Sequence, residues 1–444
     1  MGLPTTPPTS ALTSGAGVTP AGDGDVNGDG YDDLVVFDPE SDSPSGEHGT
    51  GLMQVYLGGP SGYDASPILE VYGPSSGRYL GTAGGILGDF DADGYDDILA
   101  TWEEGSWIFP GGPSGPTAAD FWDVTPIQRG QFGNSAALPG DLDQDGYDDV
   151  AIGIQNESWD DDGVHVYRGG PDGIAESLLL TNPGSYSSGE AMVAAGDLNC
   201  DGYPDLVTSG GHNSESVVIY AGGPTIGADW VKIEEPSGIE NFGRELATVG
   251  DMDGDGCDDV LIGHRSGALL YAGHSDLEKI AEMSDLTGEE ISSISLGDTD
   301  GDGVHRMALG RPTADNAGMT EAGSVTIGDV HLDGQAVELT ITGDAEACEL
   351  GTRLRSLGDL DGDGQPELAI EHDGGWVMAW GDGELHGPDS TDDDTGTDGD
   401  TDAAGCACSS AQRGGTTWGL LTLAGLLLGW RHRRRPAAGA HDAR

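Results

Sequence analysis

Basic residues are scarce in this chain. Its 444 residues contain 17 Lys and Arg against 79 Asp and Glu, which gives a formal net charge of −62 at pH 7. Nucleic acids and anionic membrane surfaces bind proteins through Lys and Arg, so this charge excludes nucleic acid as a partner. Seven bound calcium ions would reduce the net charge only to about −48, so the net charge of the protein depends on how much metal it binds.

Helical periodicity is also missing, because no segment before residue 405 repeats its apolar residues every three to four positions. The chain instead has 78 glycines, which separate short strands of alternating polarity. This pattern excludes a helical fold and indicates a turn-rich all-β protein. The eleven His residues show no metal-ligand spacing either.

The five cysteines give little information. Cys200 and Cys257 fall in the acidic loops of adjacent repeats, which are described below, and Cys348 stands alone. A disulfide between Cys200 and Cys257 requires Cα atoms within about 7 Å of each other. We expect isolated packing or surface residues instead, and this disulfide is the alternative.

One acidic loop, Asp141 to Asp149, reads DLDQDGYDD and leads into the apolar run Val150-Ala151-Ile152. It places side-chain oxygens at positions one, three, five and nine and a glycine, Gly146, at position six. Calcium takes six to eight oxygen ligands, and the carbonyl at position seven supplies a further one. Gly146 allows the positive φ that bends the loop around an ion.

This loop recurs seven times. Its first positions lie between 47 residues (Asp251 to Asp298) and 64 residues (Asp25 to Asp89) apart. We expect five complete calcium sites, whose side chains are Asp25, Asn27, Asp29 and Asp33; Asp89, Asp91, Asp93 and Asp97; Asp141, Asp143, Asp145 and Asp149; Asp197, Asn199, Asp201 and Asp205; and Asp251, Asp253, Asp255 and Asp259. The residues whose carbonyls complete the sites are Tyr31, Tyr95, Tyr147, Tyr203, Cys257 and Gln365.

The last two loops differ from the rest. The seventh has a longer acid at position nine and should still bind calcium through Asp359, Asp361, Asp363 and Glu367. The sixth has Arg306 at position nine, and its fixed positive charge repels a cation. We therefore expect weak or no binding at Asp298, Asp300 and Asp302, and about six calcium ions in all, most of them structural.

An EF-hand is the alternative for such a loop, but it needs a bidentate Glu at position twelve and flanking helices. Here position twelve holds Val36, Ala100, Ile152, Thr208, Ile262, Leu309 and Ile370. None of these is a calcium ligand, and most favour strands. The loop therefore closes a β-hairpin.

The seven repeats follow one plan over residues 14–386. A strand precedes the acidic loop, a second strand follows it, and a third strand ends in a Gly-Pro turn, as in MQVYLGGP and VHVYRGGP, before a fourth strand. Four short strands in about 50 residues, repeated seven times, predict a seven-bladed β-propeller of four-stranded blades. A sandwich or a solenoid is the alternative.

The Phe-Gly pairs at 132–133 and 242–243, the Gly-Asp that follows and the loop endings DDVAIG and DDVLIG resemble FG-GAP repeats. These repeats build the propeller of integrin α subunits and bacterial relatives. The resemblance covers about 370 residues and implies calcium on the face opposite ligand binding. Phe-Gly is intact in only two repeats, and the sixth has Glu290 in place of a glycine.

The termini differ in composition from the repeats. Residues 1–13 are Pro/Thr-rich and lack the features of a secretory signal, so we expect a start site placed too late or a shortened N-terminus. Residues 387–405 predict a disordered acidic linker. Within 406–444, Cys406, an apolar helix at 416–430 and an Arg cluster at 431–435 resemble the C-terminal sorting tails of myxobacterial surface proteins. That resemblance implies attachment to the membrane through this segment before processing near Cys406, with the propeller on the outside of the cell.

We interpret the chain as a monomeric, exported, surface-displayed binding or adhesion module. Strand parity places the loops between second and third strands on the face away from the metal. They supply the candidate ligand-binding residues Trp102, Trp159, His212, His264, Arg265, Arg311 and His372. The partner would be an extracellular protein or glycan. The alternative is an enzyme or lectin acting on surface glycans.

Overall fold

The architecture is taken from a computed structural model of the chain. The structure describes residues 19–102, 104–124, 131–155, 163–181, 188–210, 216–227, 230–251, 255–265, 267–274, 278–283, 292–296, 306–315, 318–331, 334–343, 347–373, 375–379, 385–386 and 408–413. Several predicted features lie outside these residues, namely Asp253, Asp298, Asp300, Asp302, Trp159, His212, Cys406 and the segments 1–13, 387–405, 416–430 and 431–435. No helix among the described residues is long and apolar enough to cross a membrane.

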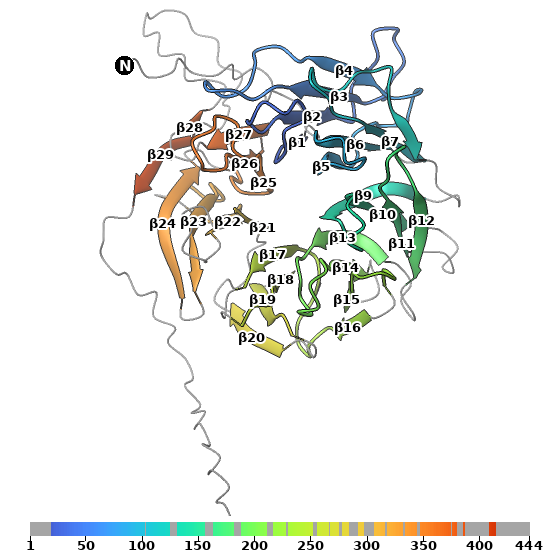
Figure 1. Cartoon of the computed structure of the whole chain (residues 1–444). Coiled ribbons are helices and arrows are strands. Elements are labelled where there is room, and N and C mark those ends of the chain that lie inside the picture. The colour runs from blue at the N-terminus through green and yellow to red at the C-terminus, as the bar shows by residue number, and fades with distance from the viewer. Residues whose placement is uncertain are drawn as a thin grey trace, which may run out of the picture.

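Seven antiparallel sheets stand in a ring around a common axis (Figure 1). Each sheet contains four strands that follow one another in the chain and pair in sequence order, and one sheet has a fifth strand in addition. The prediction of an all-β, seven-bladed propeller is therefore confirmed.

The strands of the first three blades are as follows. Blade 1 contains β1 (Thr19–Ala21), β2 (Leu34–Asp38), β3 (Leu52–Tyr56) and β4 (Leu69–Tyr72). Blade 2 contains β5 (Gly84–Gly88), β6 (Asp97–Trp102), β7 (Gly105–Phe109) and β8 (Trp122–Val124). Blade 3 contains β9 (Gln131–Gly140), β10 (Asp149–Gln155), β11 (Gly163–Arg168) and β12 (Glu176–Thr181).

The remaining four blades repeat this order. Blade 4 contains β13 (Ser188–Ala194), β14 (Leu206–Gly210), β15 (Ser216–Tyr220) and β16 (Trp230–Glu234). Blade 5 contains β17 (Leu246–Gly250), β18 (Asp259–His264), β19 (Gly267–Ala272) and β20 (Glu278–Met283). Blade 6 contains β21 (Ser292–Ser295), β22 (Arg306–Arg311), β23 (Ser324–His331) and β24 (Gly334–Gly343). Blade 7 contains β25 (Leu354–Ser356), β26 (Leu368–His372), β27 (Gly375–Ala379) and β28 (Leu385–His386).

Blade 6 has a fifth strand that the repeat pattern does not predict. Strand β29 (Cys408–Arg413) pairs antiparallel with β24, from Leu339 opposite Arg413 to Gly343 opposite Cys408. Strand β24 is ten residues long and would otherwise present an unpaired edge of N–H and C=O groups. The start of the segment expected to be a sorting tail is thus part of the propeller.

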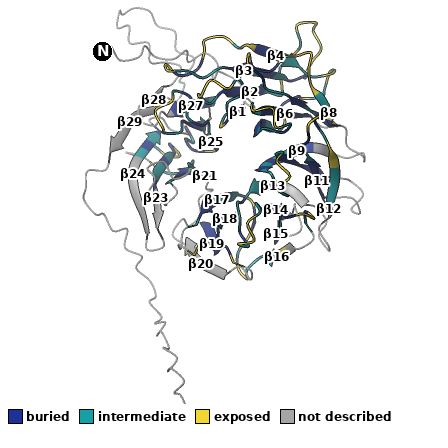
Figure 2. Ribbon diagram, viewed as in Figure 1, coloured by how far each residue is buried: buried dark blue, intermediate teal, exposed yellow. Residues whose placement is uncertain are grey.

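The hydrophobic core lies between neighbouring blades. The second and third strands are buried on both faces, and in β6 and β15 every residue is buried. Each cluster of buried side chains draws on two adjacent blades, as where Leu87 and Phe90 of blade 2 pack with Val150 and Tyr167 of blade 3. Figure 2 shows buried residues along the second and third strands of the blades. Apolar residues occur on both faces of these strands because each blade is packed between two neighbouring blades.

The ring closes without a shared strand among the described residues, because β1 to β4 form one sheet and β25 to β28 another. Blades 7 and 1 instead join through a core that includes Leu360, Trp376 and Leu34. Beside it, the Asp359 backbone N–H donates to Asp32 Oδ2 at 2.6 Å, and the Asp32 N–H donates to the Asp359 carbonyl at 3.2 Å.

The same double contact joins blades that are consecutive in the chain. The Asp25 N–H donates to Asp96 Oδ2 at 2.7 Å, and the Asp96 N–H donates to the Asp25 carbonyl at 3.2 Å. It recurs between Asp89 and Asp148 and between Asp197 and Asp258. In the four loops that have an aspartate at position eight, Asp32, Asp96, Asp148 and Asp258, this residue is therefore a link to the preceding blade.

Asp32→Ala should loosen the ring where the chain does not hold it. The change removes a charged acceptor and leaves the Asp359 N–H without its partner, a loss of about 1–3 kcal/mol. We expect a lower Tm and faster hydrogen exchange in β1 and β25. Asp96→Ala is the matched control, since it removes the same contact at a junction that the chain spans. Equal exchange in β1 and β25 for both variants would contradict this role for Asp32.

Candidate metal centres

The acidic loops and the Gly-Pro turns lie on one face of the ring and are bonded to each other. In blade 1 the N–H of Gly58, in the turn after β3, donates to Asp33 Oδ1 at 2.8 Å. In blade 2 the N–H of Gly111 donates to Asp97 Oδ1 at 2.7 Å. The parity argument that placed loops and turns on the same face is thus supported by direct contacts.

The glycine at position six adopts the left-handed conformation in every described loop. The φ angles are +90° at Gly30, +94° at Gly94, +96° at Gly146, +92° at Gly202, +96° at Gly256 and +87° at Gly364. A Cβ atom at these positions would meet nothing within 4 Å. The requirement for glycine is therefore conformational and not one of space.

The aspartate at position one organises each loop around itself. Asp141 accepts the N–H of Asp145 at 3.0 Å and that of Gly146 at 2.8 Å. The same two bonds occur at Asp25, Asp89, Asp197, Asp251 and Asp359. At Asp141 each carboxylate oxygen accepts one of these two bonds and keeps a second lone pair, so these bonds still allow it to bind an ion.

The carboxylates of three loops are spaced to fit one calcium ion. One oxygen from each of Asp89, Asp91 and Asp97 lies within 4.8 Å of the others. The same holds for Asp141, Asp143 and Asp149, and for Asp359, Asp361 and Asp363. Calcium–oxygen distances of 2.3–2.6 Å place ligands on opposite sides of an ion about 5 Å apart, so the donor sets fit.

Two buried oxygens give independent support for a cation. Asp143 Oδ1 and Glu367 Oε1 are buried and have no hydrogen-bond partner among the described residues. A buried charged oxygen without a donor is costly, and a metal ion removes that cost. Glu367 keeps its other oxygen, Oε2, bonded to the Leu360 N–H at 2.7 Å.

The acid at position nine has a structural role as well. Asp33, Asp97, Asp149, Asp205, Asp259 and Glu367 are all fully buried. Burial raises the pKa of Asp97 to about 8 and that of Glu367 to about 9. Without a compensating cation such groups would take up protons near neutral pH, whereas a divalent ion stabilises their charged form.

Loop 3 contains a cation that the sequence pattern did not reveal. The guanidinium of Arg168, the last residue of β11, contacts Asp143 and lies 2.8 Å from Asp145 Oδ2 and 3.2 Å from Glu176 Oε2. The Asp143 side chain is only 5% exposed. One feature of the sequence could have revealed it. Arg168 stands directly before a pair of glycines, and the equivalent residue is uncharged in blades 1, 2 and 4, where it is Leu57, Pro110 and Ala221.

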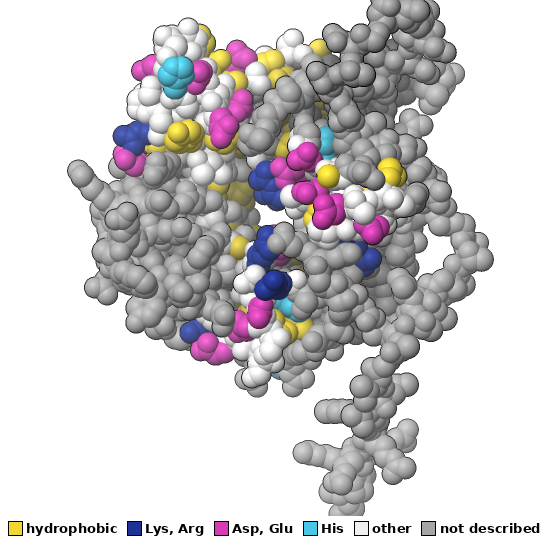
Figure 3. Space-filling model, turned by 180° about the vertical axis from the view of Figure 1, so that it is seen from behind, with side chains coloured by type: hydrophobic (Ala, Val, Ile, Leu, Met, Phe, Trp, Pro, Cys, Tyr) yellow, Lys and Arg dark blue, Asp and Glu magenta, His cyan; other side chains and the backbone are white. Residues whose placement is uncertain are grey.

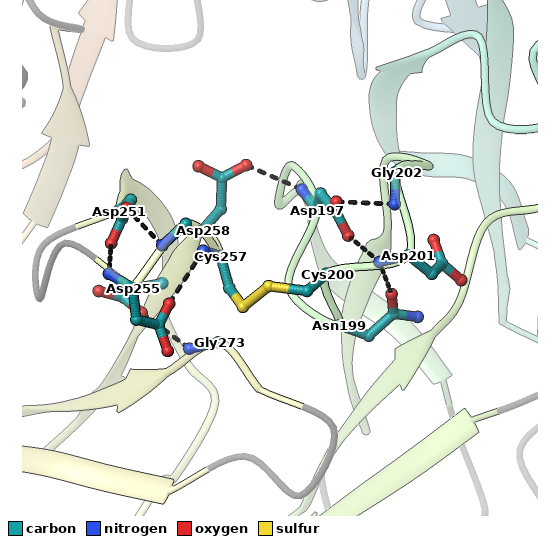
Figure 4. The surroundings of a disulfide bond; sticks show 12 residues. Asp197, Asn199, Cys200, Asp201, Gly202, Asp251, Asp255, Cys257, Asp258 and Gly273 are labelled. Atoms are coloured by element: carbon teal, nitrogen blue, oxygen red, sulfur yellow. Dashed lines mark hydrogen bonds between the residues drawn. A yellow bond between two sulfur atoms is a disulfide. The ribbon is translucent and has the colours of Figure 1, made fainter.

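Loops 4 and 5 are joined by a disulfide between Cys200 and Cys257, whose Cα atoms are 5.1 Å apart (Figure 4). The expectation that these cysteines are isolated is wrong. Cys200 is at position four of its loop and Cys257 at position seven of the next, and these two positions also meet elsewhere in the ring. In loops 1 and 2 they hold Gly28 and Tyr95, and a Cβ atom at Gly28 would be 2.7 Å from the Tyr95 ring. Cys348 is also disulfide-bonded, which corrects the view that it stands alone.

The predicted ligand-binding residues divide into buried and accessible ones. Trp102 is 8% exposed and packs against Trp107 with ring centroids 4.7 Å apart, and His372 is 7% exposed. Both are core residues, which corrects their assignment as exposed anchors. Arg311 is half-buried at the end of β22. His264 is also buried, with 8% of its surface exposed, and it lines a pocket together with the exposed Arg265.

Comparison with known proteins shows FG-GAP-like and integrin-like features. A family model described as an FG-GAP-like repeat matches residues 141–208. Integrin alpha-5 of Xenopus laevis is 27% identical over 227 residues, which are 46% of this chain and 21% of the relative. Integrin alpha-8 of Mus musculus is 33% identical over 108 residues, 22% of this chain and 10% of the relative. The chain is thus an integrin-α-like FG-GAP propeller with distant relatives.

Among solved structures, BBS1N in complex with ARL6DN, soaked with lead, superposes with a TM-score of 0.51 at 10% identity, covering 83% of this chain and 94% of that chain. This similarity concerns the fold alone. The match to integrin alpha-5 spans about a fifth of that relative's length. The disulfide and the integrin-like sequence together suggest an extracellular protein.

Calcium removal should lower the stability of the propeller. An ion that binds only the folded loop stabilises it by about 2.7 kcal/mol per site at a hundredfold excess over Kd. We expect a lower Tm in EDTA and six bound ions by native mass spectrometry. A Tm that does not change with EDTA would contradict the metal assignment, and seven tightly bound ions would contradict the effect expected of Arg306.

Arg168→Ala should strengthen calcium binding at loop 3. The guanidinium shares the carboxylates that the ion needs, and its removal should raise the affinity of one site by about tenfold. Calcium titration by calorimetry measures this, with Arg78→Ala as control, since Arg78 pairs with Glu104 away from the metal loops. Unchanged or weaker binding in Arg168→Ala would show that the arginine supports the site.

Proposed function

We propose that this protein is an exported binding or adhesion module that calcium stabilises and that binds an extracellular protein or glycan. The observation that carries the proposal is the division of the ring into two faces. On one face the acidic loops bond to the Gly-Pro turns and to the loops of neighbouring blades. The opposite face carries the loops between second and third strands, which vary in length and chemistry.

The metal in this proposal is mainly structural. Each loop closes through its own carboxylates and backbone, as at Asp141, so protein groups surround the ion and leave little space for a ligand. The ligand would therefore contact the opposite face, and calcium would act by keeping the blades together. This proposal does not require catalysis.

Display on the cell surface is part of the same proposal. It is supported by the suggestion of an extracellular location and by the resemblance of 406–444 to sorting tails. A net charge of −62 keeps separate copies apart, which supports a monomer, and disfavours nucleic acid.

A lectin is the second candidate, because one specific observation favours it. A pocket of about 250 Å³ on the face opposite the metal loops is lined mainly by polar and charged side chains, including Arg244, His264 and Thr352. Polar linings of this kind suit hydroxyl-rich ligands better than apolar ones.

A binding screen tests the proposal. The calcium-loaded protein would be applied to arrays of matrix proteins and glycans, and the same screen would be repeated with EDTA. We expect saturable binding to a restricted set of ligands that is lost with the chelator. The absence of binding to any protein or glycan in calcium would contradict the proposed function.

A further inference from the structure

Positive charge gathers in one part of this acidic molecule. Seven of the 17 Lys and Arg residues belong to blades 5 to 7. They are Lys279, Arg306 and the five residues Arg244, Arg265, Arg311, Arg353 and Arg355. Seen from behind, the molecule shows Lys and Arg side chains around the hollow at the centre of the ring (Figure 3). In a chain with 79 acidic residues, such a concentration calls for a physical explanation.

Three of these arginines line a single pocket of about 250 Å³. Its polar lining comprises Arg244, His264, Arg265, Ser292, Thr352 and Arg353. These residues lie just before the first strands of blades 5 and 7, at the start of β21, and at the turn from β18 to β19. Since Leu246 pairs with Ile262 and Leu354 with Ile370, all these positions are at the strand ends away from the metal loops.

The pocket has a net positive lining. Among the described residues that line it, Glu245 is the one acid, against three arginines. Two of these arginines also pair with acids that stand outside the lining: Glu240 accepts from Arg265 at 2.7 Å, and Glu371 accepts from Arg353 Nη2 at 2.6 Å. A guanidinium has five N–H donors, so Arg265, which is 67% exposed, keeps donors available for a ligand.

The walls of the pocket are held in place. Arg353 is bonded to Glu371 through two nitrogen atoms and lies 5.5 Å from the centre of the Trp376 ring. Ser292 Oγ donates to the Gly351 carbonyl at 2.7 Å, which joins blade 6 to blade 7. A site whose donors are fixed before binding loses less entropy when a ligand arrives.

We propose that this pocket binds a sugar acid, that is, a carboxylate on a hydroxylated ring. The inference rests on the proposed binding function and specifies one ligand class for it. Arginine matches the two oxygens of a carboxylate with paired N–H donors. The hydroxyls of Ser292 and Thr352 already donate to the Gly351 and Glu349 carbonyls at 2.7 Å each, so their remaining lone pairs serve as acceptors beside the arginines, which suits ring hydroxyls.

The size and charge of the surroundings favour a short ligand over a long polyanion. A volume of about 250 Å³ holds one anionic residue, not a chain. The rest of the molecule carries a large negative charge, which repels a polyanion beyond the pocket. At physiological salt this repulsion is screened over about 8 Å, so a single carboxylate can reach the arginines.

The test uses the full-length, calcium-loaded protein with methyl glucuronide as the probe. Methyl glucoside, which lacks the carboxylate, is the matched neutral ligand, and N-acetylaspartate amide is a carboxylate without a sugar ring. Affinities would be measured by ligand-observed NMR. We expect the glucuronide to bind more tightly than either comparison compound and to bind more weakly as salt increases.

Arg244→Gln and Arg265→Gln should each weaken glucuronide binding by about tenfold or more, since each removes a charged donor. Arg78→Gln is the control, because Arg78 forms an ion pair with Glu104 outside the pocket. Unchanged Tm and calcium content would show that the variants are folded. Equal binding of the glucoside, or equal affinity in the Gln variants, would overturn the proposal. Equal binding of the acetylaspartate would overturn its sugar component.

Two results separate this inference from the proposed function. If the wild-type protein binds ligands in the array screen and Arg244→Gln and Arg265→Gln bind them equally well, the pocket proposal fails and the binding function stands. If the array shows no ligand while the glucuronide binds through the arginines, the pocket proposal stands and the adhesion function fails.

Discussion

The fold depends on contacts between the acidic loops of neighbouring blades. At the junction of blades 7 and 1, Asp32 and Asp359 exchange two hydrogen bonds although 327 residues separate them. The same exchange joins Asp25 and Asp96 within the chain. Because the entropy cost of closing a loop grows slowly with its length, a repeated local contact is sufficient to close the ring.

Other bonds replace or reinforce this contact at two junctions. Loop 4 has Pro204 at position eight and offers no carboxylate there; instead, Gln144 of loop 3 donates to the Gly202 carbonyl. Between loops 4 and 5 the Cys200–Cys257 disulfide adds to the bond from the Asp197 N–H to Asp258. A bridge closing a loop of this length typically stabilises a protein by about 2–4 kcal/mol. Connection between loops is therefore a general requirement of the ring.

Concentrating carboxylates on one face makes the propeller dependent on cations. The acids at position nine are buried and bonded to backbone N–H groups, so they cannot escape their mutual repulsion by moving into water. We propose that calcium resolves this in the loops whose carboxylates are spaced to fit an ion. In loop 3, Arg168 supplies a positive charge from within the chain. The two ways of balancing the negative charge differ. An arginine is a permanent part of the chain, whereas the occupancy of a calcium site depends on the calcium concentration in solution.

The sequence was sufficient for features set by local chemistry. The spacing of Asp141, Asp143 and Gly146 predicted both the loop and its left-handed glycine, since both follow from the geometry of a short turn. Features set by the distance between blades could not be predicted. Arg168 and the cysteine pair depend on which positions meet across the ring, and Trp102 looked like an exposed loop residue although it packs against Trp107.

The separation of the two faces explains why binding and stability can change independently. A substitution in an acidic loop alters that loop, its Gly-Pro turn and the adjacent blade, because all three are bonded together. Around the arginine pocket, several contacts stay within one blade, as at Arg353 and Glu371 or Arg265 and Glu240. Such residues can be exchanged without disturbing the links that close the ring. The face opposite the metal loops is thus where a propeller of this kind can acquire a new ligand at the least cost in stability.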